Sequence, residues 1–141
     1  MQVKDVMNRD VKTIKKGQTI KDAAELMSRF RIGSLIVVDD SRVIGIITER
    51  DILNAISQRR DIYETHVEDI MTKKVIMVDP ELDINEAVDI MLEKKIKKLP
   101  VLKGNRLVGI ITATDICAAE PKIIENLAAL LVMPGRKLVA G

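Results

Sequence analysis

A threonine followed three residues later by an aspartate occurs twice in this chain, each time directly after an aliphatic run. The first copy lies in residues 45–51 and the second in residues 109–115, and the residues concerned are Thr48, Asp51, Thr112 and Asp115. A threonine hydroxyl and the free N–H groups at the start of a helix can bind a phosphate or sugar oxygen. A carboxylate one turn into the helix can accept hydrogen bonds from both ribose hydroxyls, as in dinucleotide-binding folds. The pattern is therefore consistent with a nucleotide ligand.

The same spacing also has a purely structural explanation. A threonine at the N-cap of a helix accepts a hydrogen bond from the backbone N–H three residues later, and an acidic side chain at that position can return the bond. The dipole of the helix also favours a carboxylate in its first turn. Because a single Thr-x-x-Asp is explained by capping alone, the nucleotide interpretation depends on what accompanies the two copies.

The counts of reactive residues exclude most enzyme chemistry. The 141 residues include one cysteine, Cys117, and one histidine, His66, so an internal disulfide and a zinc site built from several such ligands are excluded. The 21 acidic residues are spread along the chain, and no pair stands out for acid–base catalysis. We therefore expect a non-catalytic protein with no metal site and no required cofactor.

Charge and hydropathy narrow the range of partners. The formal net charge is only +2, and the aromatic residues are limited to Phe30 and Tyr63, which argues against nucleic-acid binding. No apolar run approaches the ~20 residues of a membrane-spanning helix. The N-terminus also has no apolar signal stretch. The sequence thus predicts a cytoplasmic protein without a membrane partner.

The chain repeats itself with a shift of 64 residues. Residues 6–53 align with residues 70–117 without a gap, and 15 of these 48 pairs are identical. The identical pairs include both Thr-x-x-Asp patterns and the glycines that precede them, Gly45 and Gly109. The chain is therefore a tandem duplication.

Both copies predict the same order of elements, β-α-β-β-α. A short extended piece precedes an amphipathic helix, two β-branched runs form a hairpin, and a second helix begins at the threonine of the Thr-x-x-Asp pattern. The strands are expected at residues 11–14, 35–38 and 43–47 in the first copy, and at residues 75–78, 99–102 and 107–111 in the second. Thr19 and Asp83 are expected as the N-caps of the two amphipathic helices.

These elements predict a mixed α/β (α+β) fold of two repeats packed about a pseudo-two-fold axis, because one repeat of about 60 residues cannot easily bury both faces of a small sheet. We predict repeat 1 at residues 1–58, a connector at 59–68, repeat 2 at 69–118, and a C-terminal helix with its tail at 119–141. Pro121 fits the first position of that helix, and Pro134-Gly135 fits its end. Its apolar stripe needs a cover, supplied either by the module itself or by a partner.

Three features together resemble a known family. They are the duplicated pattern Gly-h-h-Thr-x-x-Asp, where h is aliphatic, the openings Asp5-Val6-Met7 and Asp69-Ile70-Met71, and the segment Leu99-Pro100-Val101. Over about residues 3–117 they resemble a pair of cystathionine-β-synthase (CBS) domains, the Bateman module. The resemblance implies a non-catalytic, disc-like unit that often dimerises. It also implies that the clefts between the copies bind adenosine-containing ligands such as AMP, ATP, NAD or S-adenosylmethionine.

The resemblance also implies roles for particular residues. Asp51 and Asp115 would hold ribose, and Thr48 and Thr112 would contact ribose or phosphate. Each cleft of the family also uses the first strand and the start of the second strand, commonly from the other copy. The matching positions are Val11, Lys12, Ile32, Gly33 and Ser34 in the first copy, and Val75, Ile76, Ile96, Lys97 and Lys98 in the second.

The two expected clefts differ in charge. Arg50 beside Asp51 is a candidate phosphate partner, whereas Thr114 stands in its place in the second copy. If each cleft combines both copies, Arg50 joins Lys97 and Lys98. We then expect this cleft to prefer a phosphorylated ligand, and the other cleft to stay empty or to bind a less charged adenosine. Alternatively, these and the neighbouring lysines are simply solvated at a helix end, where cations suit the dipole.

Two hypotheses about function follow from the sequence. The first is a regulatory module that binds AMP, ADP or ATP, with NAD or S-adenosylmethionine as further candidates, and acts as a homodimer. Its ligand would shift its conformation, and a regulated partner protein of unknown identity would respond to that shift. The second is a protein-interaction scaffold whose ligand clefts are vestigial. The two differ in whether adenosine ligands change the stability of the protein.

Overall fold

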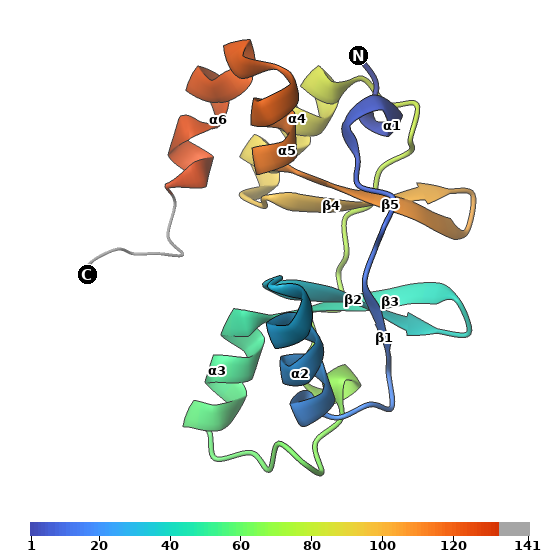
Figure 1. Ribbon diagram of the computed structural model, residues 1–141, viewed down its shortest axis with the longest axis vertical. Coiled ribbons are helices and arrows are strands. Elements are labelled where there is room, and N and C mark those ends of the chain that lie inside the picture. The colour runs from blue at the N-terminus through green and yellow to red at the C-terminus, as the bar shows by residue number, and fades with distance from the viewer. Residues whose placement is uncertain (133–141) are drawn as a thin grey trace. The chain divides into compact units, whose positions relative to one another are not determined.

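The computed structural model describes residues 1–132, which form two compact units (Figure 1). The first-repeat unit is Val11–Val75. The second-repeat unit combines residues 1–10 with the chain from Ile76 onward. The opening segments are thus exchanged, because residues 1–10 of the predicted repeat 1 pack with the second copy and residues 69–75 of the predicted repeat 2 pack with the first. The predicted mixed α/β fold of two repeats and a C-terminal helix is confirmed.

The first-repeat unit is a three-stranded sheet with two helices on one side (Figure 1). Its elements are β1 (Thr13–Lys15), α2 (Ile20–Phe30), β2 (Ser34–Asp39), β3 (Arg42–Thr48), α3 (Glu49–Ser57) and the 3-10 helix η1 (Val67–Asp69). The strand order is β1-β2-β3, in which β1 and β2 are parallel and β2 and β3 antiparallel. The predicted β-α-β-β-α order is confirmed in this copy, with strand bounds that differ by one or two residues.

Local sequence explains why these elements form. The Thr19 side chain accepts a hydrogen bond from the Asp22 N–H (3.2 Å), and the Asp22 carboxylate accepts one from the Thr19 N–H (3.0 Å), so α2 starts at a capping box. Asp40 and Ser41 join β2 to β3 with φ values of 48° and 69°, the left-handed conformation that tight hairpins require. The core formed by these elements consists of Ile14, Ala23, Met27, Leu35, Val37, Ile47 and Val67.

The second-repeat unit has a two-stranded antiparallel sheet (Figure 1). Its elements are α1 (Val3–Val6), α4 (Ile84–Lys94), β4 (Lys98–Lys103), β5 (Arg106–Thr112), α5 (Ala113–Ala119), the 3-10 helix η2 (Pro121–Ile123) and α6 (Ile124–Leu131). Asp83 caps α4 by accepting a hydrogen bond from the Asn85 N–H (2.8 Å), as predicted. Its core is larger than that of the first-repeat unit because α1 and α6 add apolar side chains to it.

The strand predicted at residues 75–78 is wrong. Only Val78 forms a bridge, parallel to Val101 of β4. In the first-repeat unit the matching ladder includes bonds from the N–H groups of Ile36 and Lys16. Their counterparts in the second copy are prolines 100 and 80, which have no N–H to donate. Two ladder bonds are therefore impossible, and the strand is reduced to a single bridge.

The C-terminal helix is covered by its own unit. Pro121 lies in the first turn, as predicted, and Leu127 and Leu130 are 0% and 1% exposed. They belong to the same core cluster as residues of α4 and α5. The predicted end at Pro134-Gly135 lies outside the described residues. Within residues 1–132 the helices are all too short or too polar to cross a membrane.

Candidate functional site

The Thr-x-x-Asp element of the first copy forms a complete capping box. Thr48 is the N-cap of α3, and its hydroxyl oxygen accepts a hydrogen bond from the Asp51 N–H (3.2 Å). The Asp51 carboxylate accepts one from the Thr48 N–H (2.9 Å). The structural explanation of this pattern is therefore correct for the first copy. One oxygen of the Asp51 carboxylate is already engaged with the backbone.

The Thr-x-x-Asp element of the second copy is half closed, that is, it has only one of the two hydrogen bonds of a capping box. The Thr112 hydroxyl accepts a hydrogen bond from the Asp115 N–H (3.0 Å). Among the described residues the reciprocal bond from the Thr112 N–H to the Asp115 carboxylate is absent. The carboxylate lies one turn into α5 and is partly exposed. The Asp115 carboxylate therefore lacks the backbone hydrogen bond that engages one oxygen of Asp51.

Several of the other predicted site residues lie beside the first element. Ser34 is paired with Thr48 across β2 and β3, and the Gly33 carbonyl accepts a hydrogen bond from the Glu49 N–H (3.0 Å) at the start of α3. The Lys12 carbonyl accepts one from the Ile36 N–H (3.3 Å) within the same sheet. Gly33 and Ser34, at the start of β2, thus lie close to the N-terminus of α3, and Lys12 lies immediately before β1 in the same sheet.

The side chains of three further first-copy residues lie in different surroundings. The ammonium nitrogen of Lys12 lies 4.2 Å from the centroid of the Phe30 ring, at the C-terminal end of α2. Arg50 is exposed on the first turn of α3. Val11 is half-buried at the beginning of the unit. A ligand role for these three side chains stays a prediction.

The second-copy residues repeat this arrangement in part. Lys98 is paired with Thr112 across β4 and β5, and the Lys97 carbonyl accepts a hydrogen bond from the Ala113 N–H (2.8 Å). The Ile96 N–H binds the Met91 carbonyl at the end of α4 (3.0 Å). The residues of the expected first strand, Val75 and Ile76, fall on either side of the boundary between the units and take no part in the β4 ladder.

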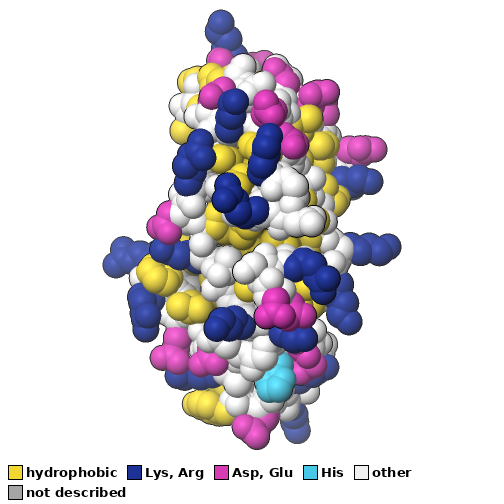
Figure 2. Space-filling view, turned by 90° about the vertical axis from the view of Figure 1, so that its right-hand side faces the viewer, with side chains coloured by type: hydrophobic (Ala, Val, Ile, Leu, Met, Phe, Trp, Pro, Cys, Tyr) yellow, Lys and Arg dark blue, Asp and Glu magenta, His cyan; other side chains and the backbone are white. Residues whose placement is uncertain are grey.

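Titratable groups with shifted pKa values lie away from both elements. A hydrogen bond donated to the Asp39 carboxylate raises the pKa of Lys16, and hydrogen bonds donated to the Glu25 and Glu81 carboxylates raise the pKa values of Lys21 and Lys103. All three lysines sit in surface ion pairs, with N···O distances of 2.9 to 3.2 Å. Acidic and basic side chains are interspersed on the surface shown in Figure 2. These shifts reflect surface pairing and mark no acid–base centre.

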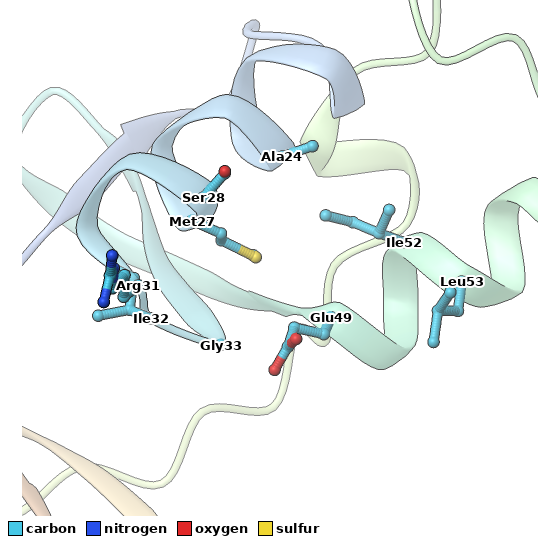
Figure 3. A pocket seen from close by; sticks show the side chains of 9 residues that line it. All are labelled: Ala24, Met27, Ser28, Arg31, Ile32, Gly33, Glu49, Ile52 and Leu53. Atoms are coloured by element: carbon cyan, nitrogen blue, oxygen red, sulfur yellow. The ribbon is translucent and has the colours of Figure 1, made fainter.

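A groove that the sequence analysis missed lies in the first-repeat unit between α2 and α3. Its volume is about 460 Å³, and its lining consists of Ala24, Met27, Ser28, Arg31, Ile32, Gly33, Glu49, Ile52 and Leu53 (Figure 3). Ile32 and Gly33 are among the predicted site residues, but Thr48 and Asp51 are not part of the lining. The sequence signal that could have indicated this groove is Leu53, an apolar residue beside the buried face of α3. Among residues 1–132, His, Cys, Asp and Glu form no cluster able to hold a metal ion.

Comparison with known proteins identifies the family. The sequence profile described as the CBS domain matches residues 3–58 and 67–122. An uncharacterized protein of Methanopyrus kandleri is 38% identical over 128 residues, which are 89% of this chain and 65% of that protein. The chain thus spans about two thirds of the length of this relative.

Solved structures with the same fold include one protein with bound ligands and another with a known assembly. The CBS domain pair of protein MJ0100, in complex with 5′-methylthioadenosine and S-adenosyl-L-methionine, matches with a TM-score of 0.78 and 29% identity, over 86% of this chain and 97% of that chain. A hexameric CBS-CP12 protein from bloom-forming cyanobacteria matches with a TM-score of 0.75 and 30% identity, over 89% and 73%. With both of its repeats matched by the family profile, the chain belongs to the CBS domain family and carries the tandem pair.

Proposed function

We propose that this CBS pair is a non-catalytic regulatory module that binds adenosine-containing ligands at its two Thr-x-x-Asp elements. The observation that carries the proposal is the half-closed element of the second copy, which leaves the Asp115 carboxylate beside a capped helix N-terminus without the reciprocal bond that occupies Asp51. A ribose offers two adjacent hydroxyl donors to such a carboxylate. The adenosine ligands of the MJ0100 pair support the same class of ligand.

The two elements are proposed to prefer different ligands. Arg50 follows the first threonine by two residues and can pair with a phosphate, so the element with Asp51 takes AMP, ADP or ATP. Thr114 stands at the matching position of the second element, which therefore takes a less charged adenosine, such as S-adenosylmethionine. NAD is a further candidate. The other residues proposed to contribute are Thr48, Thr112, Val11, Lys12, Ile32, Gly33, Ser34, Val75, Ile76, Ile96, Lys97 and Lys98.

The proposed signal is a change in the conformation of the pair when ligand binds, which a separate regulated protein detects. The protein is proposed to act in the cytoplasm and as a homodimer. No cofactor is proposed to be required, because the ligand acts as a regulator and takes part in no reaction.

The first experiment is a thermal-shift panel with AMP, ADP, ATP, NAD and S-adenosylmethionine, and with GMP as the control. A ligand at a hundred times its Kd adds about 2.7 kcal/mol of stability, which raises the melting midpoint by several degrees in a chain of this size. A rise with adenosine compounds and none with GMP supports the proposal. A panel without any rise contradicts it and favours the scaffold hypothesis, for which the open groove between α2 and α3 is the specific observation.

Calorimetric titration of variants then assigns the ligand to each element. Replacing Asp115 by asparagine keeps the shape of the side chain but removes its charge, and should cost ~1–3 kcal/mol of binding, about 5- to 150-fold in Kd. Arg50→Gln should weaken ATP binding and leave S-adenosylmethionine binding unchanged. Unaltered affinities for every ligand in Asp51→Asn and Asp115→Asn would show that these carboxylates do not hold the ribose.

A further inference from the structure

Phe30 is an exposed aromatic residue to which the proposed function gives no role. It is the one phenylalanine of the chain, lies at the C-terminal end of α2 and is 40% exposed. An aromatic side chain offers a flat apolar face on which a nucleobase can stack. What Phe30 can contact therefore depends on where its ring lies relative to the Thr-x-x-Asp element of the first copy.

Phe30 lies at the same end of the first-repeat sheet as this element. The chain passes from α2 into β2, whose first residue, Ser34, is paired with Thr48 of β3. The Gly33 carbonyl, between α2 and β2, accepts a hydrogen bond from the Glu49 N–H at the start of α3 (3.0 Å). Because α2 and α3 also lie on the same side of the sheet, the end of α2 and the start of α3 meet at the start of β2 (Figure 1).

The contact of Phe30 with Lys12 sets the distance between the ring and the element. The ammonium nitrogen of Lys12 lies 4.2 Å from the centroid of the ring. Lys12 immediately precedes β1, and its carbonyl accepts a hydrogen bond from the Ile36 N–H of β2 (3.3 Å). Since β1 and β3 flank β2, the backbones of Lys12 and Thr48 are roughly 10 Å apart, two strand spacings. A nucleoside covers this span, with its base at one end and its ribose hydroxyls at the other.

We propose that Phe30 stacks on the adenine ring of a ligand whose ribose is held by Asp51. The inference rests on the adenosine binding proposed above and assigns a contact to the base. The base replaces the Lys12 ammonium on the aromatic ring. An exposed cation–π contact contributes about 2- to 5-fold to an equilibrium, whereas a base stacked on an aromatic side chain contributes about 5- to 150-fold. The exchange is therefore favourable, and it leaves the charge of Lys12 beside the ligand, where it suits a phosphate.

The second copy has no equivalent of this contact. A shift of 64 residues takes Phe30 onto Lys94, which is exposed at the end of α4, and Lys12 onto Ile76. The remaining aromatic residue of the chain, Tyr63, belongs to the first-repeat unit. The base therefore contributes more to affinity at the element with Asp51 than at the element of the second copy.

Tryptophan fluorescence tests the stacking directly. The chain contains no tryptophan, so the indole of Phe30→Trp reports on residue 30 alone. The variant is titrated with AMP in an Asp115→Asn background, which weakens the second element. A purine stacked on an indole quenches its fluorescence, so the emission should fall to a plateau with the Kd that calorimetry gives. Tyr63→Trp in the same background is the matched control, because Tyr63 is 63% exposed beside the first turn of α2, at the opposite end from Phe30. Its emission should not change.

Affinities give a second test, which also applies if tryptophan is not tolerated at residue 30. Phe30→Leu keeps an apolar side chain but removes the ring, and should raise the Kd for AMP by about 5-fold or more. Phe30→Tyr keeps the ring and should bind AMP as the wild type does. Ribose 5-phosphate, which has no base, should bind equally to the wild type and to Phe30→Leu. Circular dichroism checks that each variant is folded.

The outcomes separate this contact from the proposed function. If calorimetry shows AMP binding but the indole at residue 30 is not quenched, or Phe30→Leu keeps the wild-type Kd, the stacking contact is wrong and the adenosine site stands. Equal quenching at residues 30 and 63 also overturns the contact. A wild type that binds neither AMP nor any other adenosine compound of the thermal-shift panel overturns both.

Discussion

The paired threonine and aspartate at the start of each second helix have a structural role that differs between the copies. Asp51 returns a hydrogen bond to the Thr48 N–H, and its loss leaves that N–H without its side-chain partner. Asp115 makes no such bond among the described residues, although the Thr112 cap itself is present. Identical residues at identical spacing therefore form different hydrogen bonds in the two copies.

This difference in hydrogen bonding predicts that replacing Asp51 lowers stability more than replacing Asp115, whereas replacing Asp115 weakens ligand binding more. Asp51→Ala should lower the free energy of unfolding by ~1 kcal/mol, the usual cost of losing a cap interaction. Asp115→Ala should cost clearly less, because it breaks no side-chain hydrogen bond. Urea denaturation of the ligand-free protein measures both. Equal losses in the two variants would mean that the reciprocal bond to Asp51 contributes nothing.

At the scale of the elements, the opening segments explain the glycine of the duplicated motif. A Cβ on Gly45 would lie 2.9 Å from the Thr72 carbonyl oxygen and would also meet the sulfur of Met71. A Cβ on Gly109 would lie 3.1 Å from the Asn8 carbonyl oxygen, with Met7 in the place of Met71. The Asp-h-Met openings thus contact the glycines of the duplicated motif. The opening of each repeat packs on the sheet of the other repeat.

We expect Gly45→Ala to destabilise the protein by ~1–3 kcal/mol, as overpacking against fixed backbone does. Gly17→Ala is the matched control. No atom lies within 4 Å of a Cβ built at Gly17, so this change should be neutral or slightly stabilising. Chemical denaturation of both variants gives the comparison. A Gly45→Ala protein as stable as wild type would show that the Met71 segment can move away at little cost.

At the scale of the whole molecule, the two repeats are alike in sequence but unequal in what surrounds them. The second copy gains α1 and α6, and its core cluster includes Val3, Leu127 and Leu130. The first copy gains the short helix η1 and keeps an open groove between α2 and α3. The C-terminal helix is therefore a structural part of the second-repeat unit and the source of the inequality.

Truncation of the α6 stripe tests this role. Leu127→Ala should cost ~2–5 kcal/mol, because a fully buried leucine leaves a cavity in the core. Ile124→Ala, on the same helix at a position that is 45% exposed, should cost much less. Melting midpoints of both variants, measured without ligand, make the comparison. Similar midpoints for the two would indicate that α6 does not depend on this packing.

The sequence by itself determined the features that depend on spacing along the chain. The 64-residue duplication, the hairpins and the helix starts at Thr19, Thr48, Asp83 and Thr112 follow from periodicity and capping within a few residues. The family was indicated by the resemblance of its duplicated motifs. The strand predicted at residues 75–78 failed although its cause was in the sequence. Pro80 and Pro100 remove two donors, but the loss appears only once the pairing of the strands is known.

Only the tertiary structure decided the features that depend on residues far apart in the chain. These are the exchange of the opening segments, the burial of α6 on its own unit, the open groove between α2 and α3, and the difference between Asp51 and Asp115. Each depends on which groups meet across tens of residues, or on whether an aspartate accepts a hydrogen bond from the N–H of its cap residue. Local pattern carries no information about such contacts, because identical segments such as the two Gly-h-h-Thr-x-x-Asp elements acquire different neighbours when the chain folds.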